Sequence, residues 1–232
     1  MERKYEHIFF DLDRTLWHFE ENSNKVLRDI YQEFGLQELI PTAELFIDHY
    51  KRINEELWVL YRENKITKDT LRWKRFGDTL RCFQLEDSAL ADRIGDYYIY
   101  HSPRQTELLP YTREVLDYLH GKGYKLHIIS NGFEEVQYIK MQESAINHYF
   151  DVVVLSEKAG VKKPHPYIFK KALKLAGALP VNSLMIGDDF YADILGAKRI
   201  GMDQIYFNFD QEQAPEPIRQ EIRCLSELMS LL

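Results

Sequence analysis

Five short apolar runs recur along the chain, separated by longer segments with the spacing of helices. Several of these runs are continuously apolar rather than alternating, which is typical of parallel strands buried on both faces. Strands that alternate with helices predict β-α-β units and therefore a Rossmann-like, doubly wound α/β sheet. The expected strands are Tyr5–Phe10, Lys125–Ser130, Val152–Leu155, Ser183–Gly187 and Gln204–Phe207.

Apolar residues at three- and four-residue spacing predict helices between the later strands. Glycines at 121, 177 and 201 follow these patterns and supply helix ends. A short helix from Ser226 is expected to close the chain. The other expected helices are Phe133–Ile146, Pro166–Ala176, Tyr191–Ile200 and one around the stripe Val115, Leu116 and Leu119.

One long interval, residues 17–104, interrupts this alternation and contains no strong strand pattern. We expect an inserted all-helical subdomain there, within a discontinuous α/β core formed by residues 1–16 and 105–232. Pro41 suits a first helical turn and Ser88 an N-cap. The amphipathic helices expected in the insertion are Pro41–Asn64, Thr67–Phe83 and Ser88–Ser102.

The charge balance limits the partners of this protein. The 232 residues include 37 acidic and 30 basic side chains, a formal net charge of −7, whereas nucleic-acid binding usually requires a basic surplus. No apolar run approaches the ~18 residues of a membrane span, and the first ten residues are too charged for a signal peptide. The two cysteines form no metal or redox spacing. We therefore expect a cytoplasmic protein without membrane or nucleic-acid partners; the sequence indicates no oligomeric state.

Polar motifs follow four of the expected strands, directly or after a short loop. Because ligands bind at the carboxyl ends of strands in open α/β sheets, the four motifs should meet at one rim. Their carboxylates suit Mg²⁺, their hydroxyl and lysine suit a phosphoryl group, and two carboxyls spaced by two residues can act as nucleophile and general acid. The pattern predicts a phosphoryl-transfer site. The motifs are Asp11-Leu12-Asp13-Arg14-Thr15, Ser130-Asn131-Gly132, Lys162-Lys163-Pro164 and Gly187-Asp188-Asp189 with Asp193.

In this order the motifs resemble those of the haloacid dehalogenase (HAD) superfamily. The helical insertion lies where that superfamily places its C1-type cap. A tighter similarity, to bacterial pyrimidine 5′-nucleotidases of the YjjG/YfnB type, rests on residues 130–133, 156–164 and 57–67. The superfamily motifs correspond here to Asp11-x-Asp13-x-Thr15, Ser130, Lys163-Pro164 and Gly187-Asp188-x4-Asp193.

The resemblance implies a role for each principal motif residue. Asp11 would be the nucleophile that forms an aspartyl-phosphate, and Asp13 would be the general acid and then the general base. Mg²⁺ would be held by the Asp11 carboxylate, the Asp13 backbone carbonyl and Asp188. Ser130 and Lys163 would bind the phosphoryl oxygens.

The same resemblance implies supporting roles. Asn131 would help to bind the phosphoryl group through its backbone N–H, and Thr15 would buttress the first loop. Asp193 would orient Asp188 or a metal-bound water. Asp189 stays open between a metal ligand and a residue at a helix start, where the helix dipole favours a carboxylate.

Two further assignments stay open. Lys162 competes with Lys163, although the superfamily's lysine directly precedes proline, which favours Lys163. Among the histidines, His165 is expected to have a loop or capping role, whereas His18 is a candidate to face the substrate.

The implied activity is that of a Mg²⁺-dependent phosphomonoesterase on a small phosphate ester, a pyrimidine nucleoside monophosphate. A sugar-phosphate or phosphoglycolate phosphatase, a phosphomutase and a non-enzymatic binding module remain alternatives. Dehalogenation is disfavoured because halide loss does not need the acid that Asp13 supplies. Aromatic residues of the insertion should be mostly core, with one or two free to stack on a base. They are Trp58, Tyr61, Trp73, Phe76, Phe83, Tyr97, Tyr98 and Tyr100, with Trp17 and Phe19 at its entry.

Overall fold

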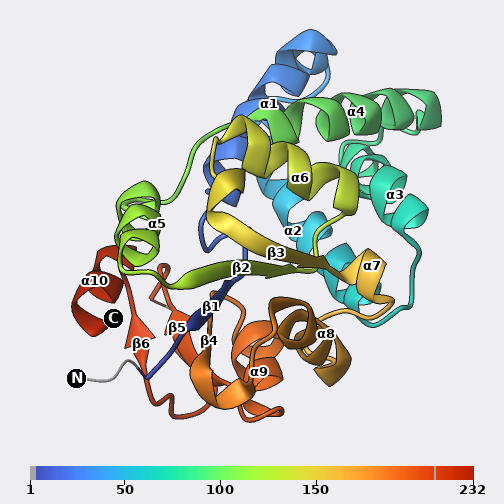
Figure 1. Ribbon diagram of the computed structural model, residues 1–232. Helices are drawn as coiled ribbons and strands as arrows, with labels where there is room; N and C mark the ends of the chain where they lie inside the picture. Colours follow the sequence, from blue (N-terminus) through green and yellow to red (C-terminus); the bar gives the residue numbers. More distant parts are fainter. Residues whose placement is uncertain (1–3, 212) are drawn as a thin grey trace. The chain divides into compact units, whose positions relative to one another are not determined.

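The computed structural model describes residues 4–211 and 213–232. Two compact units divide the chain: one runs up to Phe19 and resumes over Thr106–Leu232, and the other is Glu20–Gln105 (Figure 1). The second unit therefore begins three residues later than the insertion expected from the sequence. Trp17 belongs to the first unit, where its side chain is fully buried in a hydrophobic cluster.

The first unit contains a six-stranded parallel sheet in the order β3-β2-β1-β4-β5-β6, which confirms the doubly wound α/β class. This order places β1 at the centre, between β2 and β4. The last strand was not expected, because two residues carry no detectable periodicity. The strands are β1 His7–Phe10, β2 Lys125–Ser130, β3 Phe150–Leu155, β4 Ser183–Gly187, β5 Asp203–Phe207 and β6 Glu221–Ile222.

Helices connect these strands. The expected helix Tyr191–Ile200 is in fact a π-helical turn, η5, followed by the short α9. The 3₁₀ turns are η3 Asn147–Tyr149, η4 Pro180–Asn182 and η6 Leu225–Glu227. The helical elements are α5 Thr112–Gly121, α6 Glu134–Glu143, α7 Ser156–Ala159, α8 Pro166–Ala176, η5 Phe190–Leu195, α9 Gly196–Lys198 and α10 Leu228–Leu231.

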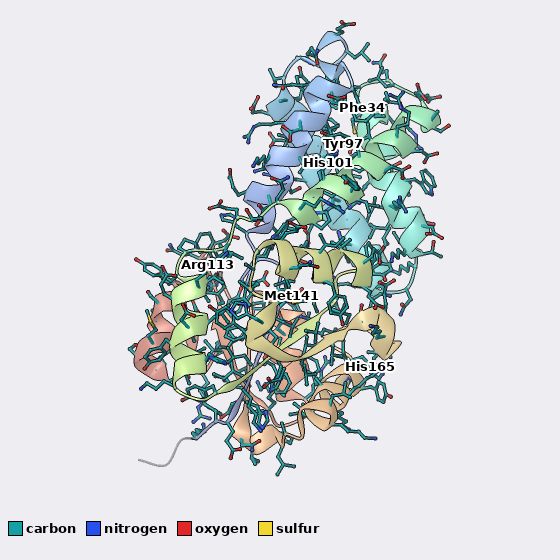
Figure 2. All side chains as sticks on the ribbon, turned by 45° about the horizontal axis from the view of Figure 1, so that its top comes forward. Phe34, Tyr97, His101, Arg113, Met141 and His165 are labelled. Carbon is teal, nitrogen blue, oxygen red and sulfur yellow. The ribbon has the colours of Figure 1, made fainter. Side chains whose placement is uncertain are left out.

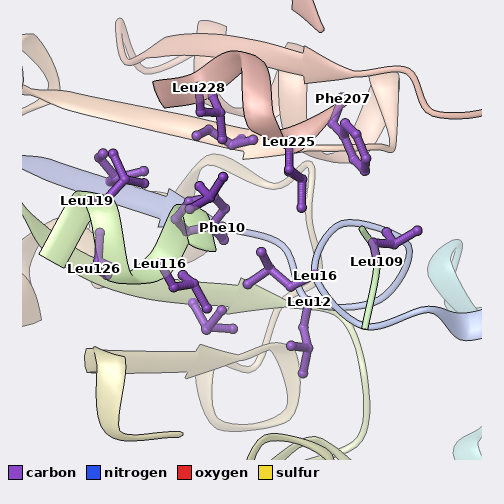
Figure 3. Close-up of a cluster of buried hydrophobic side chains, with 14 of the residues drawn as sticks. Phe10, Leu12, Leu16, Leu109, Leu116, Leu119, Leu126, Phe207, Leu225 and Leu228 are labelled. Atoms are coloured by element: carbon purple, nitrogen blue, oxygen red, sulfur yellow. The ribbon is translucent and has the colours of Figure 1, made fainter. Parts of the chain in front are cut away.

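Both faces of the sheet are buried. Successive side chains of a strand point to opposite faces, and in β1 Ile8 and Phe10 join one cluster whereas Phe9 joins another. The first cluster includes side chains of α5 and α10 (Figure 3), and the second includes side chains of α8 and α9. Burial of each Leu, Ile or Phe side chain stabilises the folded state by about 1.5–3 kcal/mol. Packing on both faces therefore fixes β1 and, with it, the motif that follows this strand.

The second unit is helical. Its first helix was not expected from the sequence. The last helix begins at Ser88 as expected, but the expected start at Pro41 and the expected N-cap at Ser88 are wrong. The Thr42 hydroxyl accepts from the N–H of Leu45 at 3.2 Å, so Pro41 precedes the helix. Asp87, rather than Ser88, caps the last helix. The helices are α1 Phe19–Glu33, α2 Ala43–Arg62, α3 Lys68–Arg81 and α4 Ser88–His101, with 3₁₀ turns η1 Leu36–Glu38 and η2 Ser102–Arg104.

Aromatic side chains form much of the core of the helical unit. Tyr50 stacks on Phe76 with ring centroids 5.0 Å apart, and Tyr98 lies 5.6 Å from Tyr50. A second group, Phe34, Tyr97 and His101, is seen in Figure 2. Trp73 and Tyr100 are exposed instead. Across the described part of the chain, no helix combines the length and apolar character needed to cross a membrane.

Candidate active site

The loop after β1 carries the first motif. The backbone N–H of Asp11 donates to the Ile186 carbonyl at 2.9 Å, which extends the pairing of β1 with β4 by one residue. The chain then turns tightly: Arg14 has a left-handed backbone (φ 61°), and Trp17 N–H donates to the Leu12 carbonyl. The first carboxylate therefore lies at the carboxyl end of the central strand.

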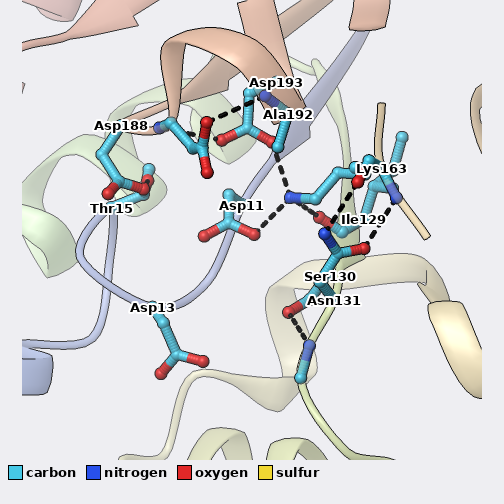
Figure 4. A network of polar contacts seen from close by, with 12 residues as sticks. Asp11, Asp13, Thr15, Ile129, Ser130, Asn131, Lys163, Asp188, Ala192 and Asp193 are labelled. Carbon is cyan, nitrogen blue, oxygen red and sulfur yellow. Dashed lines mark hydrogen bonds and ion pairs between the residues drawn. The ribbon is translucent and has the colours of Figure 1, made fainter. Parts of the chain in front are cut away.

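A cluster of buried polar side chains lies beyond the strand ends, and Lys163 is at its centre, in contact with Asp11 and Asp193 (Figure 4). Its Nζ is 2.5 Å from Asp11 Oδ1 and 2.6 Å from Asp193 Oδ1, and it donates to the Ile129 carbonyl at 2.7 Å. The residue is only 3% exposed. Burial alone would lower the pKa of Lys163, but the two carboxylates outweigh it and raise the pKa. Of the two candidate lysines, Lys163 is the one in the cluster; Lys162 is half-buried.

The Asn131 side chain braces the Lys163 backbone. Its Oδ1 accepts from Lys163 N–H at 2.7 Å, and its Nδ2 donates to the Lys163 carbonyl at 3.1 Å. This reciprocal pair joins the end of β2 to the loop before α8. The contribution of this side chain is therefore to position the lysine, and any phosphate contact of Asn131 would have to come from its backbone.

Three carboxylates gather beside the lysine. Oxygens of Asp11, Asp188 and Asp193 all lie within 4.8 Å of one another. Thr15 Oγ1 donates to Asp188 Oδ1 at 3.1 Å, so the first loop is tied directly to the end of β4. With all groups ionised, three carboxylates and the single ammonium of Lys163 leave a formal charge of −2. Clustered carboxylate oxygens with this excess charge fit a divalent cation such as Mg²⁺.

The pKa shifts follow from this crowding. Burial raises the pKa of Asp188 well above its ordinary value, and the neighbouring Asp11 and Asp193 raise it further. Burial likewise raises the pKa of Asp193 to about 7, although Lys163 opposes the shift. The pKa of Asp11 is raised by burial and lowered in part by Lys163. Without a cation, the site thus carries more negative charge than its surroundings stabilise.

Asp189 has a different place from its neighbours. Its Oδ1 accepts from the N–H groups of Tyr191 and Ala192, so it caps η5 and lies outside the carboxylate group. Gly187 is required for close approach, since a Cβ there would lie 2.2 Å from Asp193 Oδ2. Asp188, directly after β4, and Asp193, within η5, thus join the cluster, whereas Asp189 caps the start of η5.

Asp13 is held by two residues of α6 that the sequence motifs do not include. Lys140 Nζ donates to Asp13 Oδ1 at 2.5 Å, and Gln137 Nε2 donates to Asp13 Oδ2 at 2.9 Å. On α6, the apolar Val136 and Ile139 are only partly buried, whereas Gln137 and Lys140 are buried. The sequence does contain an indication of them, because two polar residues three positions apart occur in the helix that follows the Ser130-Asn131-Gly132 motif.

The histidines have structural contacts. His165 Nδ1 accepts from Tyr167 N–H at 3.2 Å and so caps α8, as expected from the sequence. His18 packs edge-on against Phe209. His7 and His127 stack inside the sheet, with Nδ1 and Nε2 3.0 Å apart.

A central parallel strand that ends in a buried carboxylate–lysine cluster defines a doubly wound α/β enzyme with its site at the strand ends. Residues 8–207 match the family described as haloacid dehalogenase-like hydrolase. The chain belongs to this family, which confirms the resemblance seen in its motifs. Pyrimidine 5′-nucleotidase YjjG of Escherichia coli K12 is 32% identical over 233 residues, covering 99% of this chain and 98% of the relative.

Other similar proteins are described by different activities. A glyceraldehyde 3-phosphate phosphatase of Pyrococcus furiosus is 40% identical over 211 residues, covering 89% of this chain and 82% of the relative. Among solved structures, HAD-hydrolase YfnB of Bacillus subtilis, bound to magnesium, has a TM-score of 0.87 at 26% identity and covers 99% of both chains. An L-2-haloacid dehalogenase of Xanthobacter autotrophicus, with a TM-score of 0.73 at 18% identity over 98% of both chains, shares the fold.

Proposed function

We propose that this protein is a Mg²⁺-dependent phosphomonoesterase that hydrolyses pyrimidine nucleoside 5′-monophosphates through an aspartyl-phosphate on Asp11. The observation that carries the proposal is the buried cluster in which Lys163 contacts Asp11 and Asp193 while Asp188 completes a group of carboxylates. Similarity to YjjG of Escherichia coli over nearly the whole chain supports the choice of substrate.

In the first half of the reaction, the Asp11 carboxylate attacks phosphorus and the bond to the ester oxygen breaks. Asp13 gives its proton to the departing alkoxide, so the nucleoside leaves as a neutral alcohol. The Lys163 ammonium stabilises negative charge on the phosphoryl oxygens. Ser130, which is buried at the end of β2, would donate its hydroxyl to one of these oxygens.

In the second half, Asp13, now a carboxylate, takes a proton from water. The water oxygen attacks phosphorus, the acyl–phosphate bond breaks, and inorganic phosphate leaves. Asp11 is regenerated as a carboxylate and Asp13 as an acid. Asp13 therefore serves both half-reactions: it donates a proton to the leaving alkoxide in the first and accepts a proton from water in the second.

The clustered oxygens and excess negative charge of these residues support a magnesium ion at this site. Asp11, the backbone carbonyl of Asp13 and Asp188 would hold it, and Asp193 would orient its neighbours. When bound, the ion offsets the repulsion between the Asp11 carboxylate and the phosphate dianion. Asp189, which caps η5, is left out of this set.

A second substrate class is favoured by a specific finding. The glyceraldehyde 3-phosphate phosphatase of Pyrococcus furiosus is more similar in percentage identity, 40% against 32%, over a somewhat shorter alignment. A short phosphorylated aldehyde or sugar is therefore the alternative substrate with the same chemistry. What the helical unit contributes to this choice stays a prediction.

A substrate panel tests the proposal. The purified protein with Mg²⁺ is assayed by phosphate release on dUMP, UMP, AMP, glyceraldehyde 3-phosphate and phosphoglycolate. We expect the highest kcat/KM with dUMP or UMP. A higher value with glyceraldehyde 3-phosphate would replace the nucleotidase by the alternative.

The control for the mechanism is Asp11→Asn. This variant cannot form the aspartyl-phosphate, so its turnover should fall by at least about 10⁴-fold. Undiminished activity would contradict the covalent mechanism whatever the substrate.

A further inference from the structure

Helix α6 turns two polar side chains inward beside the site. Gln137 is fully buried and Lys140 is 4% exposed. Long polar side chains are rarely buried unless their polar atoms have partners, because desolvation is costly. The partners of these two residues are therefore informative about what the helix does.

Lys140 is fixed both by charge and by aromatic rings. Its Nζ lies 2.5 Å from Asp13 Oδ1, and it also lies 4.2 Å from the centroid of the Trp17 ring and 5.8 Å from that of Phe19. An ammonium over a ring face is attracted by the ring quadrupole. The rings hold the head of the lysine at one place, so the lysine in turn holds one oxygen of Asp13.

Gln137 joins the acid–base residue to the phosphate-binding residue. Its Nε2 carries two hydrogens and donates to Asp13 Oδ2 at 2.9 Å and to Ser130 Oγ at 2.7 Å. Its own Oε1 is buried without a hydrogen-bond partner among the described residues. A buried carbonyl left unpaired costs about 1–3 kcal/mol, so the bridge is kept at the expense of stability.

The Ser130 hydroxyl is oriented as a consequence. Its oxygen accepts from Gln137 Nε2 and from the backbone N–H of Gly132 at 3.1 Å. A hydroxyl has two acceptor positions and one donor hydrogen. With both acceptor positions used, the hydrogen has to point elsewhere, as is needed to donate to a phosphoryl oxygen.

Gly132 leaves space for this bridge. A Cβ at this position would lie 2.3 Å from Gln137 Nε2 and 2.4 Å from its Cδ. Any larger residue would therefore displace the amide from both Asp13 and Ser130.

We propose that Gln137 and Lys140 form a clamp, the α6 clamp, that positions Asp13 and Ser130 for phosphoryl transfer. The inference rests on the proposed function. Lys140 acts through Asp13 alone, so it should affect kcat. Gln137 acts through both residues, so it should affect kcat and the KM for the phosphate ester together.

The test compares Lys140→Met, Lys140→Arg and Gln137→Leu with two controls that lie on exposed helix faces, Lys170→Met and Gln142→Leu. Rates are measured with dUMP and with p-nitrophenyl phosphate. We expect Lys140→Met to lower kcat about 100-fold with KM changed less than threefold, because a misplaced acid–base group loses most of its catalytic effect. Lys140→Arg should recover at least tenfold of this loss, and Gln137→Leu should both lower kcat and raise KM.

A second readout separates positioning from general damage to the fold. The leaving group of p-nitrophenyl phosphate needs little protonation, so Lys140→Met should still phosphorylate Asp11 and then stall at hydrolysis, which needs Asp13 as base. Rapid mixing should show a burst of one nitrophenolate per enzyme that is absent from the wild type. Melting temperatures of all variants are measured alongside.

The outcomes distinguish the two proposals. A wild type without activity on any phosphomonoester would overturn the proposed function and the clamp with it. An active wild type whose Lys140→Met variant keeps kcat within threefold, or loses it without a burst or any rescue by arginine, would overturn the clamp alone. An unchanged KM in Gln137→Leu would overturn the role given to the Ser130 bridge.

Discussion

Both units bury cations, and two of these, Lys163 and Arg75, are stabilised in opposite ways. Lys163 in the first unit is 3% exposed and contacts the carboxylates of Asp11 and Asp193. Arg75 in the helical unit is 5% exposed, and no carboxylate among the described residues pairs with it. Its guanidinium instead lies 4.7 Å from the centre of the Tyr98 ring and 5.3 Å from that of Phe76.

This difference separates a reactive site from a packed core. Around Lys163, acidic groups exceed basic ones, so the cluster is left with negative charge that a bound cation, or protons on its carboxyl groups, would balance. Around Arg75, aromatic rings attract the cation without adding a formal charge. A buried charged side chain therefore indicates a functional site when the surrounding groups have an unbalanced net charge. It indicates much less about function when the surrounding groups are neutral and close-packed.

The largest expected effect is on activity. Lys163→Met should lower kcat/KM by about 10³-fold, because a cation that stabilises the transferring phosphoryl group is lost. Arg75→Met should change kcat/KM less than about threefold. Steady-state assays of both variants, with Lys162→Met as a control on the half-buried neighbour, check the contrast. Equal losses of kcat/KM in Lys163→Met and Arg75→Met would contradict the contrast between the two buried cations.

The next effect is on stability and depends on Mg²⁺ and pH. The pKa of Asp193 is raised to about 7, so in the metal-free protein its favourable contribution is present below its ordinary pKa and is lost as pH rises through 7. Metal-free protein should therefore melt at a lower temperature at pH 8 than at pH 5. Mg²⁺ at about 100 times its Kd should add about 2.7 kcal/mol.

Calorimetry with Mg²⁺ and with EDTA at both pH values measures this effect. The Mg²⁺-induced increase in melting temperature should be larger at pH 8, because protonated carboxylates at pH 5 compete with the ion. An equal increase at pH 5 and pH 8 would contradict the assignment of the excess charge to Asp193 and its neighbours.

The smallest expected effect is that of Arg75→Met on stability. Loss of the ring contacts should cost about 1–2 kcal/mol, partly offset by the apolar replacement. The cost should be the same with Mg²⁺ and with EDTA, because no excess charge is involved. Urea unfolding of the wild type and the variant measures it, and a cost that varied with Mg²⁺ would place Arg75 in the metal-linked site.

Local patterns predicted the parts of the molecule that depend on neighbours in sequence. The apolar runs located β2 and β4 at their observed bounds, because strands buried on both faces must be apolar throughout. The strand-end motifs likewise indicated Asp11, Asp188 and one of the pair Lys162 and Lys163 as site residues. Helix caps were predicted less well: Thr42 caps a helix whose first turn was expected at Pro41, and Asp87 caps the helix for which Ser88 was the expected N-cap.

Contacts between distant segments were not predictable in the same way. Nothing near Asp13 indicates that Lys140, 127 residues later, holds its carboxylate. The sequence of α6 likewise does not indicate that Gln137 and Lys140 point inward and contact Asp13. Asp189 was equally suited to the metal and to a helix cap until the turn of η5 brought two backbone N–H groups to its carboxylate.

The sequence by itself determined the doubly wound sheet, the family and the residue types that gather at its rim, because periodicity and motif order are local properties of a chain. Only the tertiary structure decided which lysine enters the cluster, which carboxylate caps a helix and which side chains hold Asp13. Those outcomes depend on the distances between side chains that follow β1, β2 and β4, and on which polar atoms are buried away from solvent. Burial and close approach, which arise only when the sheet and its helices pack together, set the charges on which the proposed chemistry depends.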